Sequence, residues 1–354
     1  MDRARLQSLL DTSARLRIAV VGDAMLDVYL RGDVDRVSPE APVPVVRVRD
    51  RKDALGGAAN VAQNVAALGA RVELVAVVGG DDAGARLTQM LTTLGGDTRG
   101  LVKTARPTTT KTRVLARSQQ LLRVDEEVDS DCLDREVEAL IAAIDCAVAD
   151  ADALVLEDYN KGVLVAPVIA RAIAQARIKG IPVVVDPKYH NFFGYKGATV
   201  FKPNRRELEA ALGAAVDLEH PDALPLVLER LGVQNLLLTL SEKGMALVQT
   251  ADGGRQTAEG GKQTAEGRRR TADGPRSAAE VRIDRIPTTA REVYDVVGAG
   301  DTVTAYLAAM LAAGATPLEA AVIANYAAGV EVGKLGAATV SPDEVIEAFD
   351  GHVS

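Results

Sequence analysis

The chain has 354 residues, 47% of them hydrophobic and 25% charged, and a formal net charge of −8. This composition is typical of a globular protein with one to three domains, and the negative charge argues against nucleic acid or an anionic membrane surface as the main partner. No apolar run approaches the roughly 20 residues of a membrane-spanning helix, no signal-peptide pattern is present, and Cys132 and Cys146 are predicted to be free thiols, so we expect a cytoplasmic protein.

Strand-like and helix-like segments alternate along most of the chain. Short apolar runs separated by amphipathic helices are typical of a mostly parallel α/β sheet with helices on both faces. The predicted strands span residues 17–26, 71–79, 153–159, 181–187, 198–204 and 235–244, and the predicted helices span residues 56–70, 81–96, 134–149, 167–180 and 205–213. Ligands bind such sheets at the carboxyl ends of the strands. The candidate site residues are therefore the polar ones that follow the strands: Asp23, Asp27, Glu157, Asp158, Asp186, Lys188, Asn204, Glu207, Ser241 and Glu242.

Two segments, residues 28–53 and 107–127, alternate apolar and polar residues without helical spacing. They are predicted to form antiparallel strands of a small sheet that lies over the site as a lid. The alternative is an ordinary extension of the main sheet without a lid role.

Residues 250–280 carry a low-complexity repeat. The unit T-A-[DE]-G recurs every seven residues, at Thr250, Thr257, Thr264 and Thr271. Each unit contains glycine and lacks a pair of large apolar residues, which argues against a coiled coil and favours a flexible loop without chemistry. A basic docking patch at residues 268–270 is the alternative.

The segment YDVVGAGDTVTAYLAAM, residues 294–310, places a glycine turn before a helix-like run. It is not a dinucleotide-binding fingerprint, because Val303 stands where the third glycine should be, and the chain has no Walker A motif or histidine cluster for zinc. Backbone N–H groups from Ala299 to Thr302 would offer a transferring phosphoryl group the positive end of the helix dipole. A carboxylate beside such a pocket suits a general base, so Asp301 is predicted to take the proton from an attacking hydroxyl. The alternative is a helix cap behind a tight turn.

Four motifs resemble those of the ribokinase-like sugar kinases, the phosphofructokinase B family, and occur in that family's order. They are LGGAANVAQNVAALG, KPNRRELEAALG, LTLSEKG and DVVGAGDTVTA. The resemblance covers most of the chain. It implies a ribokinase-like α/β fold with a small β-sheet lid, one kinase domain over residues 1–354, and an ATP-dependent carbohydrate kinase that uses Mg²⁺.

The resemblance also implies roles for individual residues at the reacting end of the site. Asp301 is the catalytic base, and the anion hole is formed by Gly298, Ala299 and Gly300. Sugar hydroxyls are bound by Asp27, Gly56, Gly57 and Asn60. Glu157 and Lys188 contact the substrate, or alternatively form structural ion pairs.

At the nucleotide end, Asn204 and Glu207 organise Mg²⁺ through water, with capping or turn chemistry as the alternative for Asn60 and Asn204. Asp295 binds a monovalent cation such as K⁺. The ATP site is lined by Asn204, Arg205, Arg206, Glu207, Ser241, Glu242, Lys243, Gly244 and Asn325.

Within the family, four further segments resemble kinases of D-glycero-β-D-manno-heptose 7-phosphate: SPEAPVPVV, LEDYNKGVL, VVVDPK and KTRVLARSQQLLRVDEE. This resemblance implies phosphorylation of the anomeric O1 of the heptose, for lipopolysaccharide inner-core synthesis. Cations that could bind the phosphate of the substrate are Lys111, Arg113, Arg117 and Arg123 in the predicted lid and Lys188 after a core strand. Some relatives carry a fused adenylyltransferase domain, which we expect to be absent here.

Two other functions stay open at this stage. One is a kinase of the same family for ribose, fructose or fructose 1-phosphate, and the other is a non-catalytic nucleotide-binding regulator. A kinase of an unphosphorylated sugar would gain little from the lid cations. The expected partners are a small sugar phosphate and ATP, together with a second copy of the chain, because exposed lid strands often pair across a two-fold axis in the family that the sequence resembles.

Overall fold

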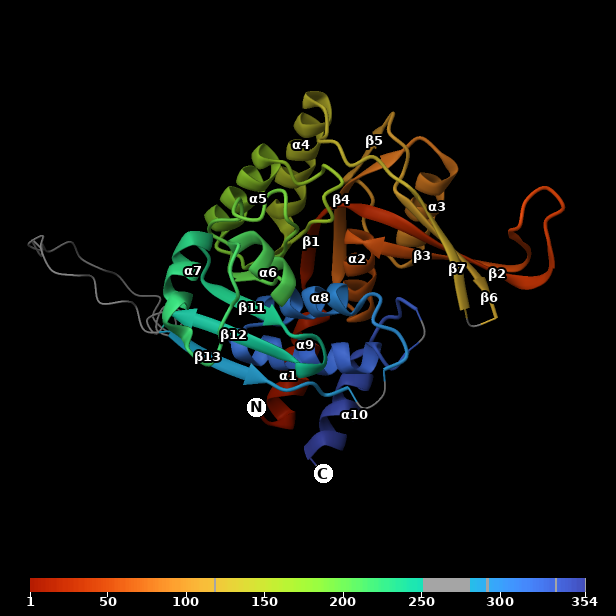
Figure 1. Cartoon of the computed structure of the whole chain (residues 1–354). Helices are drawn as coiled ribbons and strands as arrows, with labels where there is room; N and C mark the ends of the chain where they lie inside the picture. The colour runs from red at the N-terminus through yellow and green to blue at the C-terminus, as the bar shows by residue number, and fades with distance from the viewer. Residues whose placement is uncertain (118, 251–280, 291–292, 335, 354) are drawn as a thin grey trace, which may run out of the picture.

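In the computed structural model, a nine-stranded sheet forms the centre of the molecule (Figure 1). The structure describes residues 1–117, 119–250, 281–290, 293–334 and 336–353. Along the sheet the strand order is β13 (Val281–Ile286), β12 (Met245–Thr250), β11 (Asn235–Thr239), β10 (Val200–Phe201), β9 (Val183–Asp186), β8 (Ala153–Glu157), β1 (Arg17–Gly22), β4 (Arg71–Gly79) and β5 (Leu101–Thr104). All neighbours from β11 to β5 are parallel, and β12 and β13 continue that edge as antiparallel strands.

Helices cover both faces of this sheet (Figure 1). One face packs against α1 (Arg3–Ser13), α2 (Ala58–Ala67), α3 (Asp82–Thr93), α8 (Ala299–Ala312), α9 (Pro317–Glu331) and α10 (Pro342–Val353). The other face packs against α4 (Asp134–Asp150), α5 (Ala166–Lys179), α6 (Arg205–Leu212) and α7 (Leu224–Leu231). Two short 3₁₀ helices, η1 (Pro221–Ala223) and η2 (Ser241–Lys243), lie in the connections.

The two helical layers explain the sequence of the central strands. In β1, Ile18 and Val20 point into one core, whereas Ala19 and Val21 point into the other. Successive side chains of a strand point to opposite faces, so a strand covered on both sides must be apolar at every position. The predicted fold class, a mostly parallel sheet between two helical layers with a separate small sheet, is confirmed.

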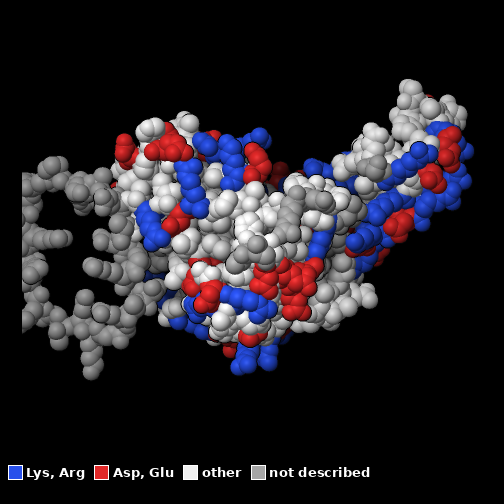
Figure 2. Space-filling view, turned by 90° about the horizontal axis from the view of Figure 1, so that it is seen from below, with Lys and Arg blue, Asp and Glu red and all other residues white. Residues whose placement is uncertain are grey.

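The small sheet has four strands in the order β3 (Pro44–Gly57), β2 (Ala24–Val37), β6 (Thr110–Ala116) and β7 (Gln119–Glu126). Its outer pairs, β2 with β3 and β6 with β7, are antiparallel, and the central pair, β2 with β6, is parallel. Figure 1 shows it projecting from the body, and Figure 2 shows this arm covered with both basic and acidic side chains.

The observed elements differ from the predicted ones mainly at their ends. The predicted strand at residues 17–26 is divided at Asp23, where the chain leaves the central sheet and enters the small one. The predicted strand at 198–204 is reduced to Val200–Phe201, partly because Pro203 has no N–H to donate to a neighbour. The small sheet also extends further toward the body than residues 28–53, because β2 begins at Ala24 and β3 ends at Gly57.

Cys132 and Cys146 are both free, as predicted. Among the described residues, no helix is both long enough and apolar enough to cross a membrane. The predicted repeat loop at 250–280, apart from Thr250 at the end of β12, and the alternative basic patch at 268–270 lie outside the described residues.

Candidate active site

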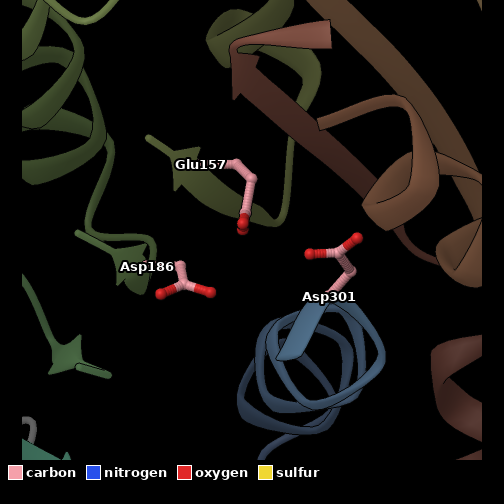
Figure 3. A group of neighbouring side chains, drawn as sticks. All are labelled: Glu157, Asp186 and Asp301. Carbon is pink, nitrogen blue, oxygen red and sulfur yellow. The ribbon is translucent and has the colours of Figure 1, made fainter. Parts of the chain in front are cut away.

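Three carboxylates meet at the carboxyl end of the central sheet. Glu157 ends β8, Asp186 ends β9, and Asp301 lies in the first turn of α8. Figure 3 shows the three side chains pointing toward one another, and a carboxylate oxygen from each lies within 4.8 Å of the others. All three are buried. The crossover order of the strands therefore brings together residues that are far apart in the sequence, at the edge where such sheets bind ligands.

Asp301 is held by hydrogen bonds at both carboxylate oxygens. Asn60 Nδ2 donates to Oδ2 at 2.7 Å, and the hydroxyl of Tyr159 donates to Oδ1 at 2.8 Å. Burial raises the pKa of Asp301 to about 6, while these two hydrogen bonds act to lower it. At neutral pH the group is therefore largely ionised and has the basicity that a proton acceptor needs.

The turn before Asp301 exposes the start of α8. Gly298 is the N-cap residue with φ 99°, and no side chain caps this helix. The first backbone N–H groups of a helix have no partner within the helix and carry the positive end of its dipole. Beside this turn, Lys202 Nζ donates to Asp186 Oδ2 at 2.7 Å, and a β-carbon at Gly300 would lie 3.7 Å from both atoms. The predicted anion hole thus has main-chain amides and a buried cation next to it.

Glu157 is fully buried, and neither of its carboxylate oxygens has a hydrogen-bond partner among the described residues. Burial, followed by the charges of Asp186 and Asp301, raises its pKa well above the usual range, against the opposing effect of Lys202. An unpartnered buried carboxyl group is costly. It is therefore a group that a bound ligand could satisfy.

The predicted sugar-binding residues lie where the small sheet joins the body. Asp27 on β2 accepts a hydrogen bond from Arg113 Nη1 at 2.6 Å, and both side chains are nearly buried. A β-carbon at Gly56 would lie 2.8 Å from Asp27 Oδ2, so only glycine leaves room for that carboxylate. Gly57 follows as the N-cap of α2, which carries Asn60. Asn60 connects this group to Asp301 through its hydrogen bond to Oδ2.

The other predicted lid cations are engaged elsewhere. Lys111 Nζ lies 3.0 Å from Glu127 and 3.5 Å from Asp125. Arg123 is about half exposed and lies 2.9 Å from Asp125. Arg117 is exposed in the turn between β6 and β7. Of the four lid cations predicted for the substrate phosphate, Arg113 alone pairs with Asp27 within the described part of the chain.

The predicted magnesium residues form a helix cap. Asn204 Oδ1 accepts a hydrogen bond from the backbone N–H of Glu207 at 2.9 Å, and Glu207 Oε2 accepts one from the backbone N–H of Asn204 at 2.8 Å, so the two make a capping box for α6. The remaining oxygen of Glu207 pairs with Lys188 Nζ at 2.5 Å, and Lys188 lies over the ring of Tyr159. The contacts of Asn204 match its capping alternative, and those of Lys188 match its ion-pair alternative. Neither set of contacts tests whether these residues also bind magnesium or substrate.

The remaining nucleotide-site predictions lie on α6, η2 and α9. The residues from Ser241 to Gly244 follow β11 as η2 and its end, and the first three are exposed. Arg205 pairs with Glu209 one turn along α6, and Arg206 is exposed. Asn325 on α9 donates to the carbonyl oxygen of Pro287 at 2.8 Å.

Asp295 has a structural contact of its own. It accepts backbone N–H groups from Val297 at 3.0 Å and from Gly336 at 3.2 Å. It thus ties the segment before the anion turn to the segment after α9.

Comparison with known proteins supports the predicted family. The sequence profile described as "pfkB family carbohydrate kinase" matches residues 15–344. The chain belongs to the pfkB family of carbohydrate kinases. Two relatives named "Bifunctional protein HldE" are those of Shewanella amazonensis, 44% identical over 339 residues, and of Rhodospirillum rubrum, 42% identical over 350 residues. The matches cover 96% and 97% of this chain but 64% of each relative, so this pfkB kinase spans less than two thirds of their length.

Solved structures confirm the fold. The Arabidopsis thaliana ribokinase complexed with ribose and ATP superposes with a TM-score of 0.66 at 20% sequence identity, covering 94% of this chain and 98% of that one. Phosphofructokinase-2 from Escherichia coli, in complex with potassium, gives a TM-score of 0.72 at 17% identity and covers 96% and 99% of the two chains. At these identities the likeness extends to the fold alone.

Sequence reasoning missed two residues of this pfkB kinase's site. Tyr159, which bonds to Asp301, and Lys202, which pairs with Asp186, received no predicted role. Both lie near the ends of predicted strands, at 153–159 and 198–204, and that position is the signal that could have placed them at the site. Asp186 was among the polar strand-end candidates but received no role.

The family implies Mg²⁺, which is bound by oxygen ligands. Asn204 and Glu207 supply oxygen atoms at the start of α6, although these atoms already make the capping box. The group of Glu157, Asp186 and Asp301 supplies oxygen atoms only, two of which, on Glu157, are without a partner among the described residues. The donor chemistry of Asn204 and Glu207 fits the ion, whereas Asp301 already accepts hydrogen bonds at both oxygens and Asp186 pairs with Lys202.

Proposed function

We propose that this chain is an ATP-dependent kinase that phosphorylates the anomeric O1 of D-glycero-D-manno-heptose 7-phosphate to the 1,7-bisphosphate, for ADP-heptose and lipopolysaccharide inner-core synthesis. The observation that carries the kinase assignment is Asp301, a buried carboxylate with both oxygens held, beside the uncapped start of α8. The heptose assignment is supported by the four subfamily-like segments and by the likeness to the HldE proteins.

In the proposed reaction, Asp301 accepts the proton of the O1 hydroxyl as O1 bonds to the γ-phosphorus and the bond to ADP breaks. The amides of the turn from Gly298 to Gly300 and the cation of Lys202 face the charge that develops on the phosphoryl oxygens. Asp27 and Glu157 accept hydrogen bonds from sugar hydroxyls, which would satisfy the unpartnered oxygens of Glu157.

Cofactors are proposed from the same residues. Mg²⁺ would be held by Asn204 and Glu207 through water, and when bound it would offset the negative charge of the ATP phosphates. The nucleotide would lie against η2 and Asn325. Asp295 would contribute to a K⁺ site, a proposal that the potassium complex of the E. coli neighbour prompts without extending to this chain.

The decisive experiment measures ADP release with heptose 7-phosphate against ribose, fructose and fructose 1-phosphate. Turnover with heptose 7-phosphate alone supports the proposal, and a preference for another sugar of the panel overturns the substrate assignment. Asp301→Asn should lower kcat by roughly 10²–10⁴-fold, the contribution expected of a general base. Asp343→Asn is the matched control, because Asp343 is also acidic and in the first helical turn, of α10, but exposed. Full activity of Asp301→Asn would remove the base.

We also propose that residues 1–354 form one kinase domain whose small sheet serves as a lid and joins two copies into a homodimer. The small sheet exposes apolar side chains at Val34, Val37, Val48, Leu121, Leu122 and Val124. Sedimentation should therefore give a dimer for the wild type and a monomer for Leu122→Lys. Ile178→Lys, at an exposed apolar position on α5, should remain dimeric. A monomeric wild type at micromolar concentration would refute the pairing.

A further inference from the structure

The hydroxyl of Tyr159 points at the proposed base from the loop after β8, in the segment LEDYNKGVL and outside the four family motifs. It donates to Asp301 Oδ1 at 2.8 Å, while Asn60 donates to Oδ2 at 2.7 Å. Burial, followed by the charges of Asp301 and Glu157, raises the pKa of the phenol well above its usual range. The phenol therefore stays protonated at any working pH and acts only as a donor toward Asp301.

The backbone around Tyr159 is held by hydrogen bonds to Asp23. The buried carboxylate of Asp23, between β1 and β2, accepts the N–H groups of Tyr159 at 2.8 Å, Lys161 at 3.0 Å and Val163 at 3.2 Å. Three hydrogen bonds to one carboxylate leave the loop little freedom.

The ring of Tyr159 lies next to Gly57 and Lys188. A β-carbon at Gly57 would lie 3.5 Å from Tyr159 Cδ2, and Lys188 Nζ lies 5.3 Å from the ring centroid on another side. The hydroxyl is thus presented to Asp301 from a backbone that Asp23 holds and from a ring bordered by Gly57 and Lys188.

Asp301 needs such a donor because burial, and then the charge of Asp186 at the end of β9, disfavour its ionised form. The other acids that face it are Glu157 at the end of β8 and Glu331 at the end of α9, and burial raises the pKa of Glu157 well above its usual range and that of Glu331 to about 8. The cation that favours the charge of Asp301 is Lys202, which already pairs with Asp186, and Lys188 is engaged by Glu207. The hydrogen bonds from Asn60 and Tyr159 are therefore what keeps this carboxylate ionised and oriented.

We propose that Tyr159 is a positioning residue for the base: its hydroxyl holds Asp301 Oδ1 and stabilises the ionised carboxylate, so that a lone pair stays directed at the acceptor hydroxyl. This inference rests on the proposed function of Asp301. The proton removed from the sugar goes to Asp301, and the phenolic proton stays on Tyr159 throughout.

The test is the pH profile of kcat/KM for Tyr159→Phe, with ATP and whichever sugar of the panel is turned over best. The base must be ionised, so wild-type activity falls as the pH drops through the pKa of Asp301, about 6. Loss of one hydrogen bond to a charged group should move this acidic limb up by about one pH unit. It should also lower kcat by about 10-fold, with little change in the KM for ATP.

Tyr306→Phe is the matched control. Tyr306 lies on the same helix as Asp301 and is buried, and its hydroxyl donates to the carbonyl oxygen of Val340 at 3.0 Å. This variant also loses one buried tyrosine hydroxyl, so its Tm should fall while its acidic limb stays at the wild-type pH. Melting curves of both variants report whether each is folded.

The outcomes separate this inference from the proposed function. If Asp301→Asn is inactive and Tyr159→Phe keeps the wild-type limb, the positioning role is overturned while the base stands. The role is also overturned if Tyr306→Phe shifts the limb equally, or if folded Tyr159→Phe is as inactive as Asp301→Asn, which would make Tyr159 part of the chemistry. If Asp301→Asn stays active, the proposed function fails and the inference with it.

Discussion

Gly298→Ala should damage the anion turn in a way that its geometry specifies. Gly298 has φ 99°, a conformation that costs a residue with a β-carbon roughly 1–2 kcal/mol. The added carbon would lie 3.1 Å from Asn60 Nδ2, 3.1 Å from Glu331 Oε1 and 3.3 Å from Ala337 Cβ. Contacts that close require the neighbours to move by a few tenths of an ångström.

The expected loss of kcat depends on which neighbours of Gly298 are displaced. Asn60 Nδ2 is the atom that holds Asp301, and Asn60 and Glu331 are both buried, so neither can turn into solvent. Removing a donor from an anion hole costs about 10²–10³-fold in kcat. Displacing the turn and its partner by part of an ångström should cost less than that ceiling, about 10-fold or more. The free energy of unfolding should fall by about 1–2 kcal/mol.

Gly314→Ala provides the matched control. Gly314 follows the other end of α8 with φ 87°, and a β-carbon there meets nothing within 4 Å. Both variants carry the same backbone cost, so thermal melting should show a loss of stability in both, larger in Gly298→Ala by the cost of its close contacts. Steady-state kinetics should then show a loss of kcat for Gly298→Ala alone. Equal kcat values in the two variants would refute the view that the turn positions the reacting groups.

Further outcomes are expected at two other positions. Glu157→Gln should raise Tm at pH 8, because burial raises the pKa of Glu157 and the cost of its charge grows as the pH rises above its unfolded value. The gain should vanish toward pH 4, where both side chains are neutral, and a gain that persists there would contradict this. Arg113→Ala should raise the KM for the sugar phosphate by about 10-fold, whereas the exposed Arg123→Ala should change it little; equal effects would contradict the special place of the Arg113–Asp27 pair.

The sequence was sufficient to predict those site residues whose positions depend on local backbone structure. The glycine turn and the acid of the first helical turn are consecutive from Gly298 to Asp301, and the strand-end residue Glu157 follows an apolar run. Such patterns report backbone geometry directly. Glu157 and Asp186 end parallel strands, so both lie at the carboxyl edge of the sheet, where ligands bind. That rule made them site candidates from the sequence.

Contacts set by register and tertiary packing could not be predicted. Pairing of β6 with β7 places Lys111 opposite Asp125 and Arg113 opposite Arg123, and nothing in the composition of those strands determines that register. It leaves Lys111 engaged by acids and turns Arg113 toward Asp27. The bond between Tyr159 and Asp301 joins residues 142 positions apart. Such a contact exists only once both sheets and α8 have assembled.

The continuous path of β2 and β3 has a mechanical consequence. Each strand runs from the sugar-binding end, at Asp27 and Gly56, far along the projecting arm, although their pairing shifts register between Arg31 and Gly32 and between Val34 and Arg36. The proposed sugar-binding residues and the projecting arm therefore belong to the same pair of strands, whereas Asp301 belongs to α8 in the body of the molecule. A rotation of this strand pair would have its hinge where the strands leave the body, near Asp23 and Gly57. The distance between the acceptor hydroxyl and Asp301 would then change with the angle of the arm.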